Sequence, residues 1–146
     1  MGWRKPRGHF DAYFAEQQRD ERLVWVARRA DSIAGFVTLL WRARHQPFAE
    51  RGIPEIADLN VYPANRRRGV ASRLLDGAEA AAFARASAVG LAVALYAAYG
   101  PAQRLYVRRG YVPDGRGVTA RGEPIAEGAT VKIDDDLVLW LLLERR

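Results

Sequence analysis

The chain has 146 residues, a length that fits one folded domain with a sizeable hydrophobic core. Hydrophobic residues make up 49% of it and cysteine is absent, which excludes a disordered chain, a disulfide framework and thiolate metal sites. The net charge of +6 comes almost entirely from arginine, whose forked guanidinium suits phosphate groups.

The first part of the chain predicts one helix followed by three strands. After an irregular start over residues 1–8, aromatic residues recur with helical spacing over residues 9–20. Residues 22–31 and 36–44 predict a β-hairpin that turns at 31–35. Pro and Gly then indicate a loop over 45–54, and a strand is expected over 55–62.

The second part alternates helices and strands. A helix after Gly69 carries an apolar stripe of Val70, Leu74, Ala78 and Ala81, with Glu79 outside it. We expect an apolar strand over 88–96, a short helix over 100–110, a strand from 111 that breaks at Pro-Asp-Gly, a loop over 119–136 and a strand over 137–144.

This order of elements predicts one α/β or α+β domain spanning residues 1–146, with a mixed sheet flanked by helices. No apolar run approaches the roughly 20 residues of a membrane helix, and the chain start lacks the apolar core of a signal peptide. A cytoplasmic protein is therefore expected.

Three arginines, Arg66, Arg67 and Arg68, precede Gly69 at the predicted start of a helix. The helix macrodipole already makes that end positive, so cations there are unfavourable unless an anion binds. The first N–H groups of a helix have no internal partner, and a glycine followed by small residues lets phosphate approach them. The spacing matches neither a Walker loop nor a dinucleotide-binding glycine pattern. The pattern indicates a phosphate-bearing ligand of another class.

Two motifs resemble those of the GNAT N-acetyltransferase family. The run Arg66-x-x-Gly69-x-Ala71 is similar to its R/Q-x-x-G-x-G/A signature and follows a strand ending in "LNVYP". Downstream, "YGPAQRLYVRRGY" resembles the family pattern N-x-x-A-x-x-L-Y-x-x-x-G-F/Y, with Tyr99 in place of the usual asparagine. The resemblance extends from about residue 23 to the C-terminus. It implies a single GNAT-type domain with a mostly antiparallel sheet, and an acyltransferase that uses acetyl-CoA and no metal.

The resemblance also implies a site for the coenzyme. Pantetheine is expected along the main chain of Leu59 and Val61, with the Val61 N–H near the thioester carbonyl. The main-chain N–H groups of the loop that follows are expected to hold the pyrophosphate: Arg66, Arg67, Arg68, Gly69, Val70, Ala71 and Ser72. Tyr99 and Ala102 are expected to contact the coenzyme, and Tyr106 to protonate the departing thiolate.

The acceptor is expected to be a primary amine of a small molecule or a protein, and its ammonium group must lose a proton before attack. Glu55 is the candidate base, acting through water. Asp58 is second, because strand alternation places it on the opposite face unless a bulge intervenes. His45 is expected to be inert. The run Asp134, Asp135 and Asp136 is expected to supply solubilising charge before an apolar strand and to hold no metal.

Two other functions stay open: a basic nucleic-acid-binding module, and a coenzyme A-binding domain without catalysis. The first is disfavoured because Trp25, Trp41 and Trp140 fall in strand patterns and form no aromatic platform. GNAT domains begin with a strand and a helix before the one expected over 9–20, so that first strand is expected to be missing or truncated. The exposed edge, together with the apolar strand over 137–144, predicts a homodimer.

Overall fold

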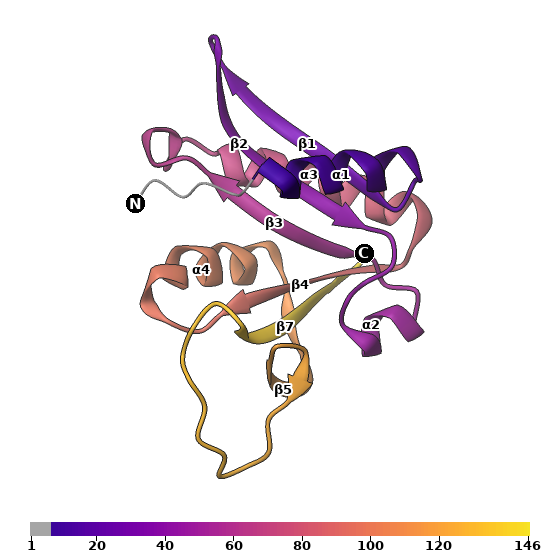
Figure 1. Cartoon of the computed structure of the whole chain (residues 1–146), viewed down its shortest axis with the longest axis vertical. Coiled ribbons are helices and arrows are strands. Elements are labelled where there is room, and N and C mark those ends of the chain that lie inside the picture. The colour runs from indigo at the N-terminus through magenta and orange to yellow at the C-terminus, as the bar shows by residue number, and fades with distance from the viewer. Residues whose placement is uncertain (1–6) are drawn as a thin grey trace.

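The computed structural model describes residues 7–146 (Figure 1). Its helices are α1 (Arg7–Gln18), α2 (Gln46–Glu50), α3 (Val70–Arg85) and α4 (Gly100–Arg109). Its strands are β1 (Arg22–Arg29), β2 (Ser32–Leu40), β3 (Glu55–Val61), β4 (Ala88–Ala94), β5 (Val112–Ala120), β6 (Glu123–Pro124) and β7 (Leu137–Glu144). No helix in these residues is long and apolar enough to cross a membrane.

The seven strands of the described chain form one sheet in the order β1-β2-β3-β4-β7-β5-β6. β3 and β4 run parallel, and every other neighbouring pair is antiparallel. The prediction of a mixed, mostly antiparallel sheet flanked by helices is confirmed.

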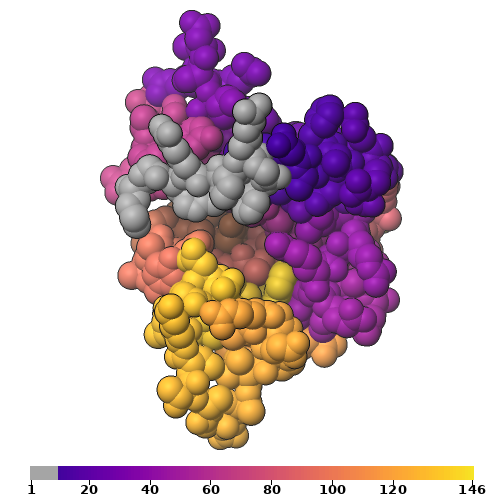
Figure 2. Space-filling view, in the orientation of Figure 1, coloured from indigo at the N-terminus to yellow at the C-terminus, as the bar shows by residue number. Residues whose placement is uncertain are grey.

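Helices cover both faces of the sheet. Since side chains alternate along each strand, one strand contacts the helices of both faces. On β2, Val37 and Leu39 enter a core shared with α3 and α4, whereas Phe36 meets the ring of Phe10 in α1. On β7, Trp140 faces a second cluster around Phe48 of α2. α1 and α2 therefore lie on one face, and α3 and α4 on the other. Figure 2 shows the face with α1, where the segments after β5 form the lower end of the molecule.

The first half of the chain differs locally from the prediction. α1 begins at Arg7 rather than at residue 9, and the rest of the irregular start lies outside the described residues. The hairpin turns at Ala30, whose φ of 52° is left-handed, so residues 32–35 belong to β2 and not to the turn. Residues 46–50 were predicted as a loop but form α2. Pro47 lies in the first turn of this helix, where proline is tolerated.

α3 starts at Val70 as predicted, but its buried side differs from the predicted stripe. Leu75 and Ala82 are fully buried, while Ala81 is only partly so. Glu79, predicted to be outside, is buried because the guanidinium of Arg109 reaches its carboxylate at 2.7 Å. Burial raises the pKa of Glu79, and the charge of Arg109 partly offsets this.

The sheet edges also differ from the expectation. β7 lies between β4 and β5, so this apolar strand has no free edge. β1 is the edge strand on the side of the predicted missing first strand. Whether a strand precedes α1 concerns residues before Arg7, which lie outside the described part of the chain.

Candidate active site

A β-bulge interrupts the middle of β3. The register with β2 jumps between Ala57 and Asn60. Asp58 and Leu59 therefore oppose the single residue Val37, and Asp58 takes a left-handed φ of 56°. Because one extra residue is inserted, the side-chain alternation of β3 shifts by one position beyond Ala57.

The bulge brings Asp58 to the face that carries α1, on which Glu55 also lies. Leu59 packs into the core next to α3, while Asp58 accepts a hydrogen bond from the Tyr13 hydroxyl of α1 at 2.5 Å. Arg44 forms an ion pair with Glu55 at 2.6 Å and also lies close enough to Asp58 to interact with its charge. Asp58 was expected on the opposite face unless a bulge intervened. The bulge is present, so Asp58 shares a face with Glu55.

β3 and β4 pair only where both strands begin. Glu55 is in register with Gly90 and Ile56 with Leu91, and no further pairs join these two strands among the described residues. The strands therefore part toward their carboxyl ends. The gap between them opens toward the loop before α3 on one side and the start of α4 on the other.

The main chain of β3 faces this gap at the two expected pantetheine positions. The Tyr62 N–H donates to the Ala34 carbonyl of β2 at 2.9 Å. Because alternate residues of a strand direct their main-chain groups to the same side, Leu59 and Val61 direct theirs away from β2. The Val61 carbonyl accepts a hydrogen bond from Nε of Arg66 at 3.1 Å, which agrees with that direction.

The loop that joins β3 to α3 presents a run of main-chain donors. Arg67 and Gly69 have left-handed φ values of 62° and 77°, and the Arg73 N–H donates to the Gly69 carbonyl at 3.1 Å. No acceptor in the described chain receives a hydrogen bond from the N–H groups of residues 67–72. A Cβ on Gly69 would meet nothing within 4 Å, so the loop is open to a ligand. These features fit a pyrophosphate.

The second motif lies at the start of α4. Tyr99 and Ala102 are partly buried against the core beneath α3. Burial, and then the nearby charge of Asp135, raise the pKa of Tyr99. Tyr106 is 7% exposed and packs edge-to-face on Tyr111 with ring centroids 5.8 Å apart. Burial raises the pKa of Tyr106 to about 12, so its phenol is protonated at neutral pH.

His45, expected to be inert, joins two distant parts of the sheet. Its Nε2 lies 2.8 Å from the Asp114 carboxylate of β5, and its ring stacks on Trp140 at 4.3 Å. Both His45 and Asp114 are buried. The partners lie 69 positions apart, so no sequence spacing could have signalled the contact.

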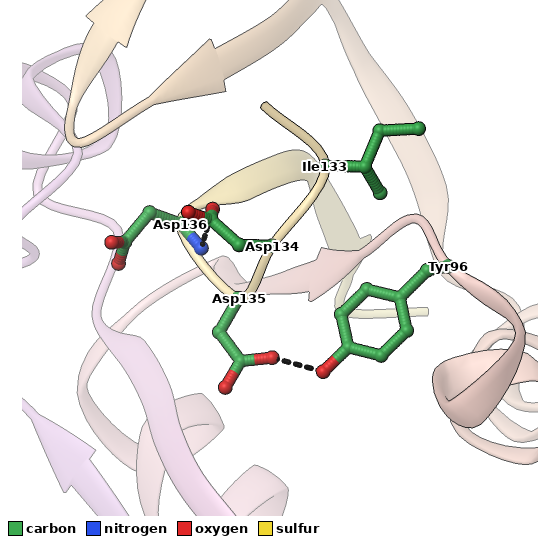
Figure 3. A pocket seen from close by; sticks show the side chains of 5 residues that line it. All are labelled: Tyr96, Ile133, Asp134, Asp135 and Asp136. Atoms are coloured by element: carbon green, nitrogen blue, oxygen red, sulfur yellow. Dashed lines mark hydrogen bonds between the residues drawn. The ribbon is translucent and has the colours of Figure 1, made fainter. Parts of the chain in front are cut away.

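A hollow of about 450 Å³ lies between the end of β4 and the start of β7 (Figure 3). It is lined by Tyr96, Ile133, Asp134, Asp135 and Asp136. Asp135 accepts a hydrogen bond from the Tyr96 hydroxyl, which raises the pKa of Tyr96 to about 12, and Asp134 accepts one from the Asp136 N–H at 2.9 Å. The acidic run thus holds local structure as well as supplying charge. No group of side chains in residues 7–146 is arranged to hold a metal ion.

A family model described as an acetyltransferase (GNAT) domain matches residues 20–113. The match spans β3, the loop before α3, the gap beside β4 and the whole of α4. Comparison with curated proteins gave no match.

Several solved structures share the fold. An N-acetyltransferase from Staphylococcus aureus Mu50 is 20% identical, with a TM-score of 0.70 over 96% of this chain and 78% of that one. Ribosomal-protein-alanine N-acetyltransferase from Brucella melitensis is 15% identical, with a TM-score of 0.69 over 97% and 80%. Spermidine N-acetyltransferase from Vibrio cholerae, in complex with CoA and spermine, is 17% identical, with a TM-score of 0.65 over 97% and 76%.

Proposed function

The chain belongs to the family of GNAT acetyltransferases, and we propose that it transfers the acetyl group of acetyl-CoA to a primary amine of a small molecule or a protein. The observation that carries this proposal is that two features lie at the same end of β3. One is the gap that opens where β3 and β4 separate, and the other is the run of unpaired N–H groups of residues 67–72. A linear pantetheine arm in the gap would bring its pyrophosphate to these donors.

The position of each element supports the coenzyme-binding role that we propose for it. Leu59 and Val61 offer main-chain groups to the amides of pantetheine, once the Arg66 side chain leaves the Val61 carbonyl. The N–H groups of residues 67–72 bind the pyrophosphate, and the exposed side chains of Arg66, Arg67 and Arg68 neutralise its charge. Tyr99 and Ala102 contact the coenzyme from the start of α4, on the other side of the gap.

Tyr106 is proposed as the proton donor to the leaving sulfur. With a pKa of about 12, Tyr106 is a weaker acid than a thiol in water, whose pKa is ~8.5, so complete proton transfer to the sulfur is unfavourable. Its first contribution is therefore a hydrogen bond to the sulfur as negative charge develops there. The same burial keeps the phenol protonated before each turnover.

Glu55 is proposed as the base that takes the proton of the acceptor amine through water, with Asp58 as the alternative on the same face. Three carboxylates gather on this face, those of Glu16, Glu55 and Asp58, with the guanidinium groups of Arg22 and Arg44 between them. A face with this charge suits an acceptor that carries positive charge.

Two measurements test the proposal. The first is acetyl-CoA binding by calorimetry, and the second is thiol release from acetyl-CoA in the presence of polyamines, aminoglycosides, amino acids or N-terminal peptides. Binding and turnover with at least one amine are expected. Binding without any turnover would favour the coenzyme-binding domain that lacks catalysis. No binding, with oligonucleotide affinity that falls steeply with salt, would favour the nucleic-acid-binding module.

We also propose that the protein acts as a cytoplasmic homodimer, with the β1 edge as the contact. β1 has no partner on its outer side among the described residues, and Val26 on this strand is 48% exposed. Ile33, at the start of the adjacent β2, is 43% exposed. Pairing two such edges about a two-fold axis would satisfy the free main-chain groups of β1. Light scattering should give twice the 16.3 kDa chain mass, and a single-chain mass at high concentration would contradict this.

A further inference from the structure

Glu55 is a buried carboxylate whose two oxygens are both held by one residue. Its side chain is 1% exposed. Oε1 accepts a hydrogen bond from the main-chain N–H of Arg44 at 2.9 Å. Oε2 accepts from the Arg44 guanidinium, from NH2 at 2.6 Å and from Nε at 3.2 Å. These three hydrogen bonds occupy most of the roughly four acceptor sites of the carboxylate, and its burial leaves little room for a water or an amine beside it.

The two groups of Arg44 that hold Glu55 differ in how firmly they are fixed. The main chain at Arg44 precedes His45, whose ring is buried between Trp140 and Phe48 and paired with Asp114. The Arg44 side chain, in contrast, is 63% exposed. Its guanidinium can therefore turn into solvent while the main-chain hydrogen bond keeps Glu55 in position.

The position of the guanidinium is also the position that a cationic acceptor would favour. Glu55 and Asp58 share a face of β3, and Arg44 interacts with the charge of both. An ammonium group carries the same charge as the guanidinium, so it competes for the same carboxylates. Binding of a charged acceptor and uncovering of Glu55 are then one event.

We propose that Arg44 is a latch on Glu55: its guanidinium covers the carboxylate until a cationic acceptor displaces it, which keeps acetyl-CoA from being hydrolysed when no acceptor is bound. This inference rests on the proposed function, since it takes Glu55 to be the base. Arg44 is a positioning residue, because it acts on the reaction only through Glu55.

Hydrolysis of acetyl-CoA by water is the reaction that the latch suppresses. A water oxygen forms a bond to the thioester carbon while Glu55 takes one of the water protons. The carbon–sulfur bond then breaks, and the sulfur leaves with its electron pair and receives a proton. The products are acetate and coenzyme A thiol, and ionisation of the acid releases one proton to solvent.

The test measures thiol release from acetyl-CoA without any amine, in wild type, Arg44→Ala, Glu55→Gln and the double variant. Arg44→Ala keeps the main-chain hydrogen bond to Glu55 and removes the guanidinium. We expect it to raise hydrolysis by about 10-fold or more, a fraction of the ~10²–10⁴ that a positioned base contributes. The double variant should lose that gain.

Two further variants separate the latch from a general disturbance. Arg42→Ala removes an exposed arginine two positions away, whose side chain makes no hydrogen bond or ion pair within residues 7–146, and should hydrolyse acetyl-CoA at the wild-type rate. Arg44→Lys keeps a cation beside Glu55 and should restore most of the suppression. If Arg44→Ala does not fold, Arg44→Gln replaces it, because it loses the charge but keeps a polar group.

Each outcome decides a different point. Acetyl-CoA binding without a gain in Arg44→Ala, or a gain that persists in the double variant, overturns the latch and leaves the proposed function intact. Failure of wild type to bind acetyl-CoA in calorimetry overturns the proposed function and the latch with it. A Glu55-dependent gain supports both.

Discussion

Replacing Gly69 by valine tests the phosphate loop, on which the proposed function depends most. Gly69 lies at the N-terminus of α3 with a φ of 77°, and a Cβ there would point into open space. A β-branched side chain at this position would stand in front of the N–H groups of residues 67–72, where we expect the pyrophosphate. The substitution should therefore act on acetyl-CoA binding more than on packing.

The size of the effect follows from the hydrogen bonds that would be lost. A hydrogen bond to a charged group contributes about 1.5–3 kcal/mol, so moving the pyrophosphate off two N–H groups costs about 3–6 kcal/mol. This corresponds to a loss of at least a hundredfold in affinity for acetyl-CoA. The left-handed φ adds a separate cost to folding of about 1–3 kcal/mol for a residue with a Cβ.

Gly52→Val is the matched control. Gly52 has a φ of 67°, a Cβ on it would also meet nothing within 4 Å, and it lies in the turn after α2, away from the loop. Both variants should lose similar melting temperature, and only Gly69→Val should lose affinity in calorimetry. The assignment of the loop is refuted if Gly69→Val binds acetyl-CoA as tightly as Gly52→Val does.

Two further predictions concern the elements on either side of the gap. Tyr106→Phe keeps the buried ring but removes the proton donor, so turnover should fall by about 10²–10⁴-fold while the affinity for acetyl-CoA stays near that of wild type. Near-normal turnover, measured where the chemical step limits the rate, would show that Tyr106 is not the acid. Gly35→Ala would put a Cβ 2.4 Å from the Asn60 carbonyl of β3. It should therefore lower stability by about 1–3 kcal/mol and weaken acetyl-CoA binding, whereas unchanged affinity in calorimetry would show that the main chain of β3 does not hold the coenzyme.

Much of the fold was predictable because local signals and tertiary packing agree. The apolar runs of β4 and β7, the glycine before α3 and Gly110 after α4 each predict an element that the structure contains. The hairpin was misplaced because the turn at Ala30 uses a left-handed alanine, which no local signal favours over the Gly35 nearby. α2 was missed because a five-residue helix carries too little periodicity to register.

The tight turn before α3 was predictable because the motif marks it with Gly69. The site was not predictable where it depends on contacts between distant side chains. Glu79 is buried where the Arg109 guanidinium of α4 reaches it, and His45 is buried where its Nε2 meets the Asp114 carboxylate of β5. Neither pair has a spacing in sequence that a helix or strand period would bring together.

The bulge in β3 supports the proposal that coenzyme and acceptor meet at one strand. With regular alternation, Asp58 would face the core beneath α3 and Leu59 would face α1. The extra residue reverses this, so Leu59 and Val61 keep their side chains in the core while their main-chain groups face the gap, and Asp58 joins Glu55 on the face of α1. In the function we propose, the donor thioester lies along the edge of β3 and the base acts from the α1 face. One inserted residue, which the hydrophobic pattern does not reveal, would then give this short strand one side for the coenzyme and another for the acceptor.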